Sequence, residues 1–275
     1  MNFWSSTKKN FINVFEKPKP YFYLNNDYMY MNAYKTNPIV FRAVSTYVKH
    51  INTIDLDNKP ANWHRIITSI VQNLLITGNV FVDKNLEVLT INSYNNCHNK
   101  QYKSSLLHLK LNTDEHGVGF SPIFVSKRAI EAHEEVSKFI MGIIQNGGKP
   151  SGILSHKDVY ETTGSVERKL QELYDHINKV GSFALLEGDY EWKQIGISPE
   201  KLELLAHKSQ CEREIAIAFD IPPVLLGIVE STYNNYAESR RHFLENSVMP
   251  ILQYIIYELN IYLEFNIKIK ENLES

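Results

Sequence analysis

The stretch that decides the fold runs from Ser182 to Leu263 and reads SFALLEGDYEWKQIGISPEKLELLAHKSQCEREIAIAFDIPPVLLGIVESTYNNYAESRRHFLENSVMPILQYIIYELNIYL. Pro222 and Pro223 each remove a backbone donor and fix φ, and each pushes the preceding residue out of the α region. The pattern therefore predicts two helices, the first over 199–219, joined by a rigid corner and an ordered polar loop at 230–236. Nothing in this stretch supplies a nucleophile, a metal site or a phosphate cradle, so it predicts architecture.

The helix expected over 199–219 has an apolar side and a charged side. The apolar side carries Leu202, Leu205, Ile215, Ala216 and Phe219, and the charged side carries Lys201, His207, Lys208, Glu212 and Arg213. The charges are either a solvated face with Glu and Lys spaced for helix pairs, or a surface facing a charged partner that moves past it. The pattern alone favours the solvated face.

The second helix carries an apolar stripe at three- and four-residue spacing, which predicts a core or inter-subunit helix. Its members are Leu244, Val248, Leu252, Ile255, Leu259 and Leu263. Pro250 interrupts the stripe and predicts a kink or a restart. Before the two helices, residues 182–188 and 189–197 predict a strand pair with its turn at 187–189.

Composition and charge are those of an ordinary globular protein. The chain has 275 residues, 43% hydrophobic and 22% charged, with a formal net charge of −2. This charge argues against tight, static binding to nucleic acid, although DNA could still slide past such a surface. Two cysteines far apart predict free thiols. No apolar run approaches the roughly 20 residues that span a bilayer, so we expect a soluble, cytoplasmic protein with no membrane contact.

The N-terminal half predicts alternating helices and strands after an irregular arm over 1–36. Asn37 and Pro38 are a helix N-cap and first-turn proline, and a second helix over 63–76 ends at Gly78. Further along, the sequence predicts a hairpin over 80–91 turning at 83–85, a polar loop over 92–105 and a strand over 106–111. The tyrosines between Tyr21 and Tyr34 are either an interaction surface or aromatics laid on the body of the same subunit.

The middle of the chain predicts a projection of two helices. Ser121 and Pro122 open a helix that extends to residue 146, a length of roughly 37 Å, with a mostly charged middle. A short extended tip at 149–160 leads to another helix over 165–179. A helix so polar cannot lie wholly on the core of one subunit, so it either projects into solvent or packs laterally on neighbours.

The chain lacks every local catalytic motif that we considered. The GGKPS turn fails the phosphate-loop pattern, and Cys97 and His98 have no further ligands nearby at metal-site spacing. We therefore expect no enzyme activity, no cofactor and no metal. An enzyme whose site assembles through space remains an alternative, because triads can form from distant residues.

The order of elements resembles the portal (head-to-tail connector) proteins of tailed double-stranded-DNA bacteriophages and prophages. The carrying segments are NPIVFRAVSTYVKHI (37–51), LLITGNVFV (74–82), LLHLKLNTDEHGVGFSPI (106–123), IIQNGGKPSGIL (143–154) and, most specifically, residues 210–260. They fall in the same order across about four fifths of the chain. The match resembles a shortened member, since family members usually continue with helical sequence beyond the last matched helix.

The resemblance implies an α+β, mainly helical subunit with a wing-type body, a two-helix stem and a short clip-like tip. In this division, 1–36 is the arm, 37–120 and 181–275 form the body, and 121–180 forms the stem with the tip at 149–160. The helix 199–219 is tunnel-type, with Lys201, Lys208 and Arg213 as candidates for contact with DNA phosphates and Pro222 and Pro223 as the structural corner.

The resemblance also implies a function and partners. Subunits would form a homo-oligomeric ring, usually dodecameric, at one vertex of the capsid in the virion, after assembly in the bacterial cytoplasm. Double-stranded DNA would enter and leave through the ring. The ring would dock the terminase large subunit, capsid and head-completion proteins. The remaining alternative is a degenerate prophage remnant that does not assemble.

Overall fold

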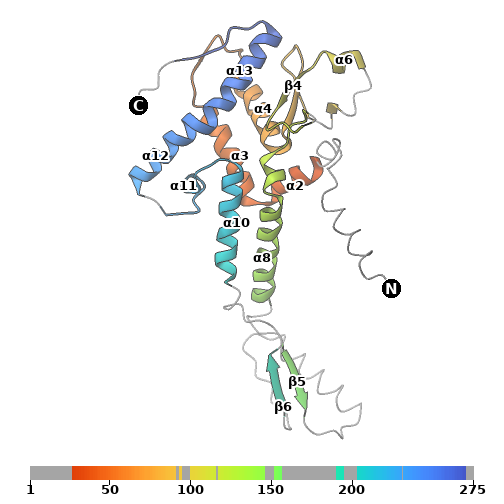
Figure 1. The fold of residues 1–275 in the computed structure, drawn as a ribbon, viewed down its shortest axis with the longest axis vertical. Coiled ribbons are helices and arrows are strands. Elements are labelled where there is room, and N and C mark those ends of the chain that lie inside the picture. The colour runs from red at the N-terminus through yellow and green to blue at the C-terminus, as the bar shows by residue number, and fades with distance from the viewer. Residues whose placement is uncertain are drawn as a thin grey trace, which may run out of the picture. The chain divides into compact units, whose positions relative to one another are not determined.

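A computed structural model describes a mainly helical α+β protein (Figure 1). The chain divides into two compact units, Met1–Ala132 with Ser209–Ser275 and, separately, His133–Lys208. Among the described residues, no helix is long and apolar enough to cross a membrane. The structure describes residues 27–90, 93–94, 100–115, 117–145, 152–156, 190–194, 203–230 and 232–270.

The first unit opens with α2 (Asp27–Thr36), where the sequence predicted an irregular arm. That prediction is wrong for these residues, because Tyr30 and Ala33, three positions apart, are buried against the core. Tyr30 is only 1% exposed, so this tyrosine lies on the body of its own subunit, whereas Tyr28 is 85% exposed. Tertiary burial thus organises a segment that its polar and aromatic composition made look irregular.

Helix α3 (Pro38–Ile51) begins as predicted. The Asn37 side chain accepts hydrogen bonds from the N–H groups of Ile39 and Val40 at 3.0 and 3.3 Å. Pro38 occupies the first turn, where its missing N–H costs no intrahelical bond. The buried face consists of Val40, Ala43, Val44, Thr46, Tyr47 and Ile51.

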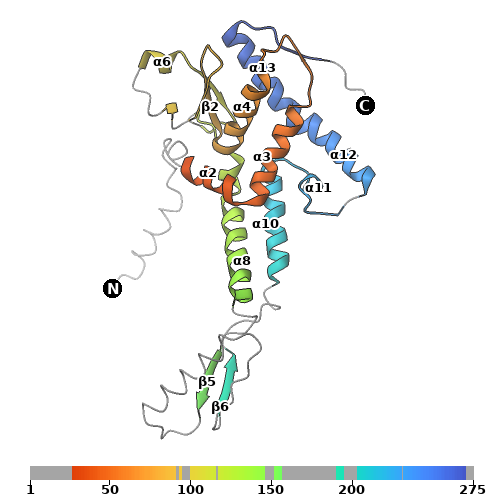
Figure 2. The same cartoon turned by 180° about the vertical axis from the view of Figure 1, so that it is seen from behind.

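Helix α4 (Trp63–Thr77) lies beside α3 in both views (Figures 1 and 2) and ends at Gly78, as predicted. Gly78 adopts φ of 77°, and a Cβ there would lie 2.5 Å from the Phe120 carbonyl carbon. The next residue, Asn79, begins the strand β2 (Asn79–Val82), and all residues of this strand are buried. Glycine is therefore required both by the left-handed backbone and by close packing.

A three-stranded antiparallel sheet has the order β3–β2–β4, with β3 at Val88–Leu89 and β4 at Leu107–Lys110. The β2–β3 hairpin confirms the predicted turn, which is organised by the Asp83 carboxylate accepting from the N–H groups of Asn85 and Glu87. The expected loop over 92–105 is wrong in part, because its end forms the short helix α6 (Lys100–Ser104).

The single helix expected over 121–146 is divided at Ser126 into α7 (Pro122–Val125) and α8 (Lys127–Gln145). Ser121 caps α7 as predicted, accepting from the Phe124 N–H at 3.2 Å. The Ser126 hydroxyl donates to the Pro122 carbonyl at 2.8 Å. The Ser126 N–H donates to the same carbonyl at 2.9 Å, so the chain turns at Ser126 without losing this backbone hydrogen bond.

After α10 (Leu204–Ala218), the corner leads into α11 (Pro223–Leu226) and ends at Gly227, whose φ is 75°. The polar loop expected over 230–236 is shorter than predicted. Helix α12 (Tyr233–Phe243) begins inside it because the Thr232 side chain accepts from the Asn235 N–H.

The sequence predicted a kink or a restart at Pro250, and the helix is irregular just before that residue. A π-helical turn, η2 (Leu244–Val248), joins α12 to α13 (Met249–Leu263), with Pro250 in the first turn of α13. The π-turn is wider than an α-helical turn. It leaves room for the ring of Pro250 and does not need the N–H group that proline lacks. Of the predicted stripe, Val248, Leu252, Ile255 and Leu259 are buried.

Two short strands connect distant parts of the first unit. The strand β1 (Leu56–Asp57) pairs antiparallel with β7 (Lys268–Ile269). Burial of Leu56 and Ile267 joins this pair to the same core as α3, α4 and α13. The pairing closes the unit around one hydrophobic core.

In the second unit, β5 (Gly152–His156) pairs antiparallel with β6 (Tyr190–Gln194) over five residue pairs. The sequence instead predicted 182–188 as the partner of the second strand. That segment lies outside the described residues, as does the helix expected over 165–179. The described partner of β6 is therefore β5, which lies in the segment 149–160 that the sequence predicted as the tip.

Candidate nucleic-acid and subunit interfaces

The structure describes two of the three residues proposed to contact DNA. Lys201 lies outside the described residues, Lys208 is half-buried and Arg213 is exposed. Helix α10 begins at Leu204, and the expected start at residue 199 lies outside the described residues. A separation of five residues places Lys208 and Arg213 about 140° apart around a helix. Of the two described candidates, Arg213 is therefore the one whose side chain is exposed to a partner.

The proline corner is held by hydrogen bonds from two other elements. Asp220 adopts φ of 53°, and the Ser247 hydroxyl in η2 lies 2.9 Å from both its carbonyl and its carboxylate oxygen. The Tyr47 hydroxyl in α3 donates to the Phe219 carbonyl at 2.8 Å. The corner is therefore positioned by contacts that the sequence analysis missed, because Tyr47 and Phe219 lie 172 residues apart.

The environment of Tyr47 explains why this contact is stable. Burial raises the pKa of Tyr47, and the negative charge of Asp220 raises it further. The ring of Tyr47 meets that of Phe243 edge-on, with centroids 4.8 Å apart. The hydroxyl thus remains a proton donor to the end of α10, and the aromatic contact holds it in place.

An apolar patch lies on the second unit, formed by the end of α8 and the start of α10. It surrounds a hollow of about 510 Å³. Ile144 is 64% exposed and Leu205 is 76% exposed. Leu205, which the sequence placed on the apolar side of its helix, is thus an apolar side chain left in water. We call this the α8–α10 apolar patch; its lining residues are Ile140, Ile143, Ile144, Glu203, Leu204, Leu205 and Ala206.

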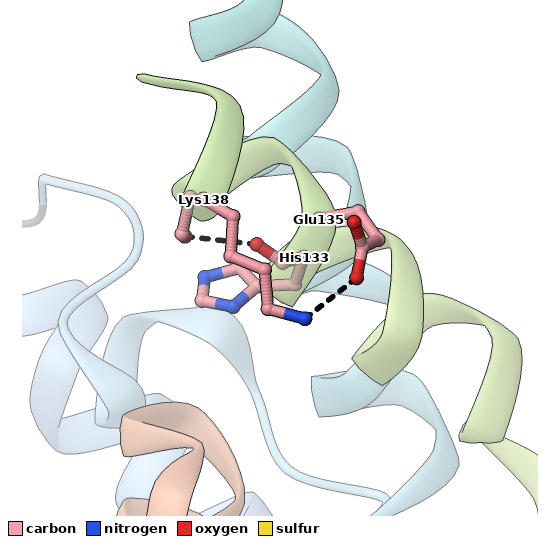
Figure 3. Close-up of polar contacts among 4 residues, drawn as sticks. His133, Glu135 and Lys138 are labelled. Carbon is pink, nitrogen blue, oxygen red and sulfur yellow. Dashed lines mark hydrogen bonds and ion pairs between the residues drawn. The ribbon is translucent and has the colours of Figure 1, made fainter. Parts of the chain in front are cut away.

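The charged middle of α8 makes local contacts along its own helix (Figure 3). Lys138 Nζ lies 2.7 Å from Glu135 Oε1, and this hydrogen bond raises the pKa of Lys138. The Ser137 hydroxyl donates to the His133 carbonyl at 2.8 Å. These are contacts between residues three or four apart, which support a solvent-facing helix but form no reaction centre.

A buried polar network connects β2, β4 and the loop before α7. The Asn79 amide donates to the Gly119 carbonyl at 2.6 Å, and its oxygen accepts from the Gly119 N–H at 3.1 Å. The same oxygen accepts from His108 Nε2 at 3.0 Å. Burial, followed by the charge of Lys110, lowers the pKa of His108 to about 4. The histidine is therefore a neutral structural donor.

The described residues hold no group of three or more His, Cys, Asp or Glu side chains that could bind a metal. Cys211 is half-buried, and burial followed by the charge of Glu214 raises the pKa of its thiol. A raised pKa disfavours the reactive thiolate. Cys97 and His98 lie outside the described residues.

The family model for phage portal proteins, described as "Phage portal protein", matches residues 54–275. The chain belongs to this family, whose members are structural and non-enzymatic.

Two relatives from Rickettsia match parts of the chain. One, an uncharacterized protein of Rickettsia bellii (strain RML369-C), is 35% identical over 159 residues, which cover 55% of this chain and 41% of the relative. Another, from Rickettsia felis (strain ATCC VR-1525 / URRWXCal2), is 34% identical over 160 residues, with the same coverage. The chain thus aligns with less than half the length of these relatives.

Solved structures show the same fold. The neck of a native GTA particle, computed with C12 symmetry, matches with a TM-score of 0.63 and 22% identity, covering 91% of this chain and 85% of that chain. A portal protein of the HK97 family from Corynebacterium diphtheriae matches with a TM-score of 0.61 and 11% identity, covering 88% and 97%.

Proposed function

We propose that this protein is the subunit of a ring at one capsid vertex, through which double-stranded DNA is packaged and ejected. Membership of the portal family supports this proposal, as does the similarity to a particle neck with C12 symmetry. The ring would reside in the virion and assemble in the cytoplasm of a bacterial host. It would also dock the terminase large subunit and the head-completion proteins.

The observation that carries the proposal is the α8–α10 apolar patch. Ile144 and Leu205 are large aliphatic side chains left mostly in water. Burying one such side chain completely is worth about 1.5–3 kcal/mol. A ring gives each copy a neighbour that covers this patch, and repeating one heterologous contact around an axis closes the assembly.

The weak charge of the chain suits a conduit for DNA. Each phosphate–cation contact adds affinity through counterion release, so a wall with few cations holds DNA loosely. In this proposal α10 lies near the tunnel, and Arg213 supplies an exposed cation to it. Helix α8 would belong to the stem, with the segment 149–160 at the clip-like tip that meets the motor.

Mass photometry and negative-stain microscopy of the purified protein test the proposal. The expected result is rings with a central hole, and Ile144→Asp and Leu205→Asp should each shift the population to monomers by burying a charge in the contact. Tyr28→Asp is the matched control, because Tyr28 is 85% exposed on α2 and outside the patch. A wild-type protein that stays monomeric at high concentration contradicts the proposal.

A further inference from the structure

The sequence around α3 is free of acidic residues. Residues 28–54 contain no Asp or Glu, although acidic residues make up 31 of the 275 positions. The same segment contains Lys35, Arg42 and Lys49. Helix α3 thus contains cations with no compensating charge in its own sequence or in the residues that flank it along the chain.

Two of these cations share the outer face of α3. Arg42 and Lys49 are seven residues apart, so they lie on the same side of the helix and about 10 Å apart along its axis. Both side chains are exposed. The opposite face is buried through residues such as Val44 and Tyr47. The packing of α3 therefore directs both charges outward.

A third cation joins them from the end of α12. The ring of Phe243 meets that of His50 at 5.3 Å and 90°, so the end of α12 packs against α3. Arg240, which is exposed, lies one turn before Phe243. Burial lowers the pKa of His50, and the positive charges of Arg240 and Lys49 contribute to lowering it. The charges of Arg240 and Lys49 therefore both act on His50, at the end of α3.

The charge of Asp220 acts on Tyr47, on the buried face of α3, and not on the face that carries Arg42 and Lys49. Asp220 lies next to α3 and accepts from Ser247 at 2.9 Å, and Glu245 pairs with Arg241 at 3.9 Å. Within the described part of the chain, Arg42, Lys49 and Arg240 form no ion pair with a carboxylate. We call these three residues the α3 basic surface.

We propose that the α3 basic surface binds the phosphate backbone of double-stranded DNA. DNA offers one negative charge per about 1.7 Å of its axis, so cations about 10 Å apart can each reach a phosphate in any sequence. The contact reads no base, as suits a surface along which DNA moves. This inference rests on the proposed function and assigns a DNA contact on α3, separate from the candidates on α10.

The test is the salt dependence of binding to a short labelled blunt duplex, measured by fluorescence anisotropy on intact protein. The triple variant Arg42→Gln, Lys49→Gln and Arg240→Gln should bind at least tenfold more weakly at low salt. Its slope of log K against log salt should be smaller by about 2 to 3, since each phosphate contact contributes about 0.9.

A second triple variant, Lys127→Gln, Lys138→Gln and Lys268→Gln, removes the same charge from α8 and β7. It should retain most of the affinity and the slope. A charge-conserving variant, Arg42→Lys with Arg240→Lys, should bind close to wild type, because phosphate neutralisation requires charge but not a guanidinium. Equal losses in both Gln triples would show only a net-charge effect and overturn the assignment.

Two outcomes separate this inference from the proposed function. If wild-type rings form but the first triple variant binds DNA normally, the α3 assignment is wrong and the ring proposal stands. If that variant binds DNA normally but loses its rings, the surface binds an acidic face of a second copy instead. Absence of rings in the wild type would contradict the proposed function itself.

Discussion

Replacing Gly119 by alanine should destabilise the fold severely, because the new methyl group has no space. A Cβ on Gly119 would lie 2.1 Å from the Gly78 carbonyl oxygen and 3.0 Å from Asn79 Oδ1. The Gly78 oxygen already accepts from the Leu111 N–H at 2.9 Å, which joins the end of α4 to the strand β4. Backbone atoms on both sides must therefore shift.

The magnitude follows from the bonds that such a shift breaks. Asn79 exchanges two buried hydrogen bonds with Gly119, and the Leu111 bond is a third. At about 1 kcal/mol each, their loss should lower the free energy of unfolding by about 3 kcal/mol. For a chain of this size that corresponds to a fall in Tm of roughly 6–12 °C.

Urea denaturation followed by circular dichroism measures the change, with Gly142→Ala as the control. Gly142 lies within α8 and an added Cβ meets nothing within 4 Å, so alanine there should stabilise the helix by up to about 1 kcal/mol. If Gly119→Ala costs less than about 1 kcal/mol, or if both variants behave alike, the packing argument is refuted.

Three further predictions concern a hydrogen bond, a titration and the channel. Tyr47→Phe removes the donor to the Phe219 carbonyl and should cost about 1–2 kcal/mol in urea denaturation, without loss of the helical circular dichroism signal. The folded protein holds the His108 pKa below the usual histidine value of 6.5, so the stability from its neutral form is present above pH 6.5. That stability should fall as the pH drops toward about 4, and His108→Gln should flatten the decline of Tm over this range. In assembled rings, Arg213→Gln should weaken DNA binding more than Lys208→Gln, since Lys208 is half-buried; the reverse order would exclude Arg213.

Elements with a local signal were predictable. The cap at Asn37, the proline that follows it and the stop at Gly78 each depend on residues within one helical turn. The irregular turn before Pro250 was predictable for the same reason, because the N–H group that proline lacks affects only the turn that precedes it. These elements follow from backbone rules that operate before any tertiary contact forms.

The missed elements depend on contacts with distant residues. Helix α2 forms where Tyr30 meets the core, which its own composition does not reveal. Helical spacing placed Leu205 on the apolar side of its helix, but no described part of its own subunit covers it. The spacing of apolar residues identifies which side chains share one face of a helix. Whether that face is buried depends on which other element of the fold packs against it.

The candidate site shows the same division. The sequence predicted the corner at Pro222 and the cations of α10, but the structure separates Lys208 from Arg213 around the helix and leaves Lys201 outside the described residues. Arg240 belongs to the α3 basic surface only because α12 packs against α3. Charges distant in sequence become one surface through folding alone.

The sequence by itself determined the family, the helical class and the positions of the helix caps and the corner, because these depend on short segments with specific residue types. Only the tertiary structure decided which side chains hold the corner, that β1 pairs with β7, and which apolar and basic faces remain open. Each of these features depends on contact between two segments that lie far apart in the sequence. No local pattern of residues predicts such a contact.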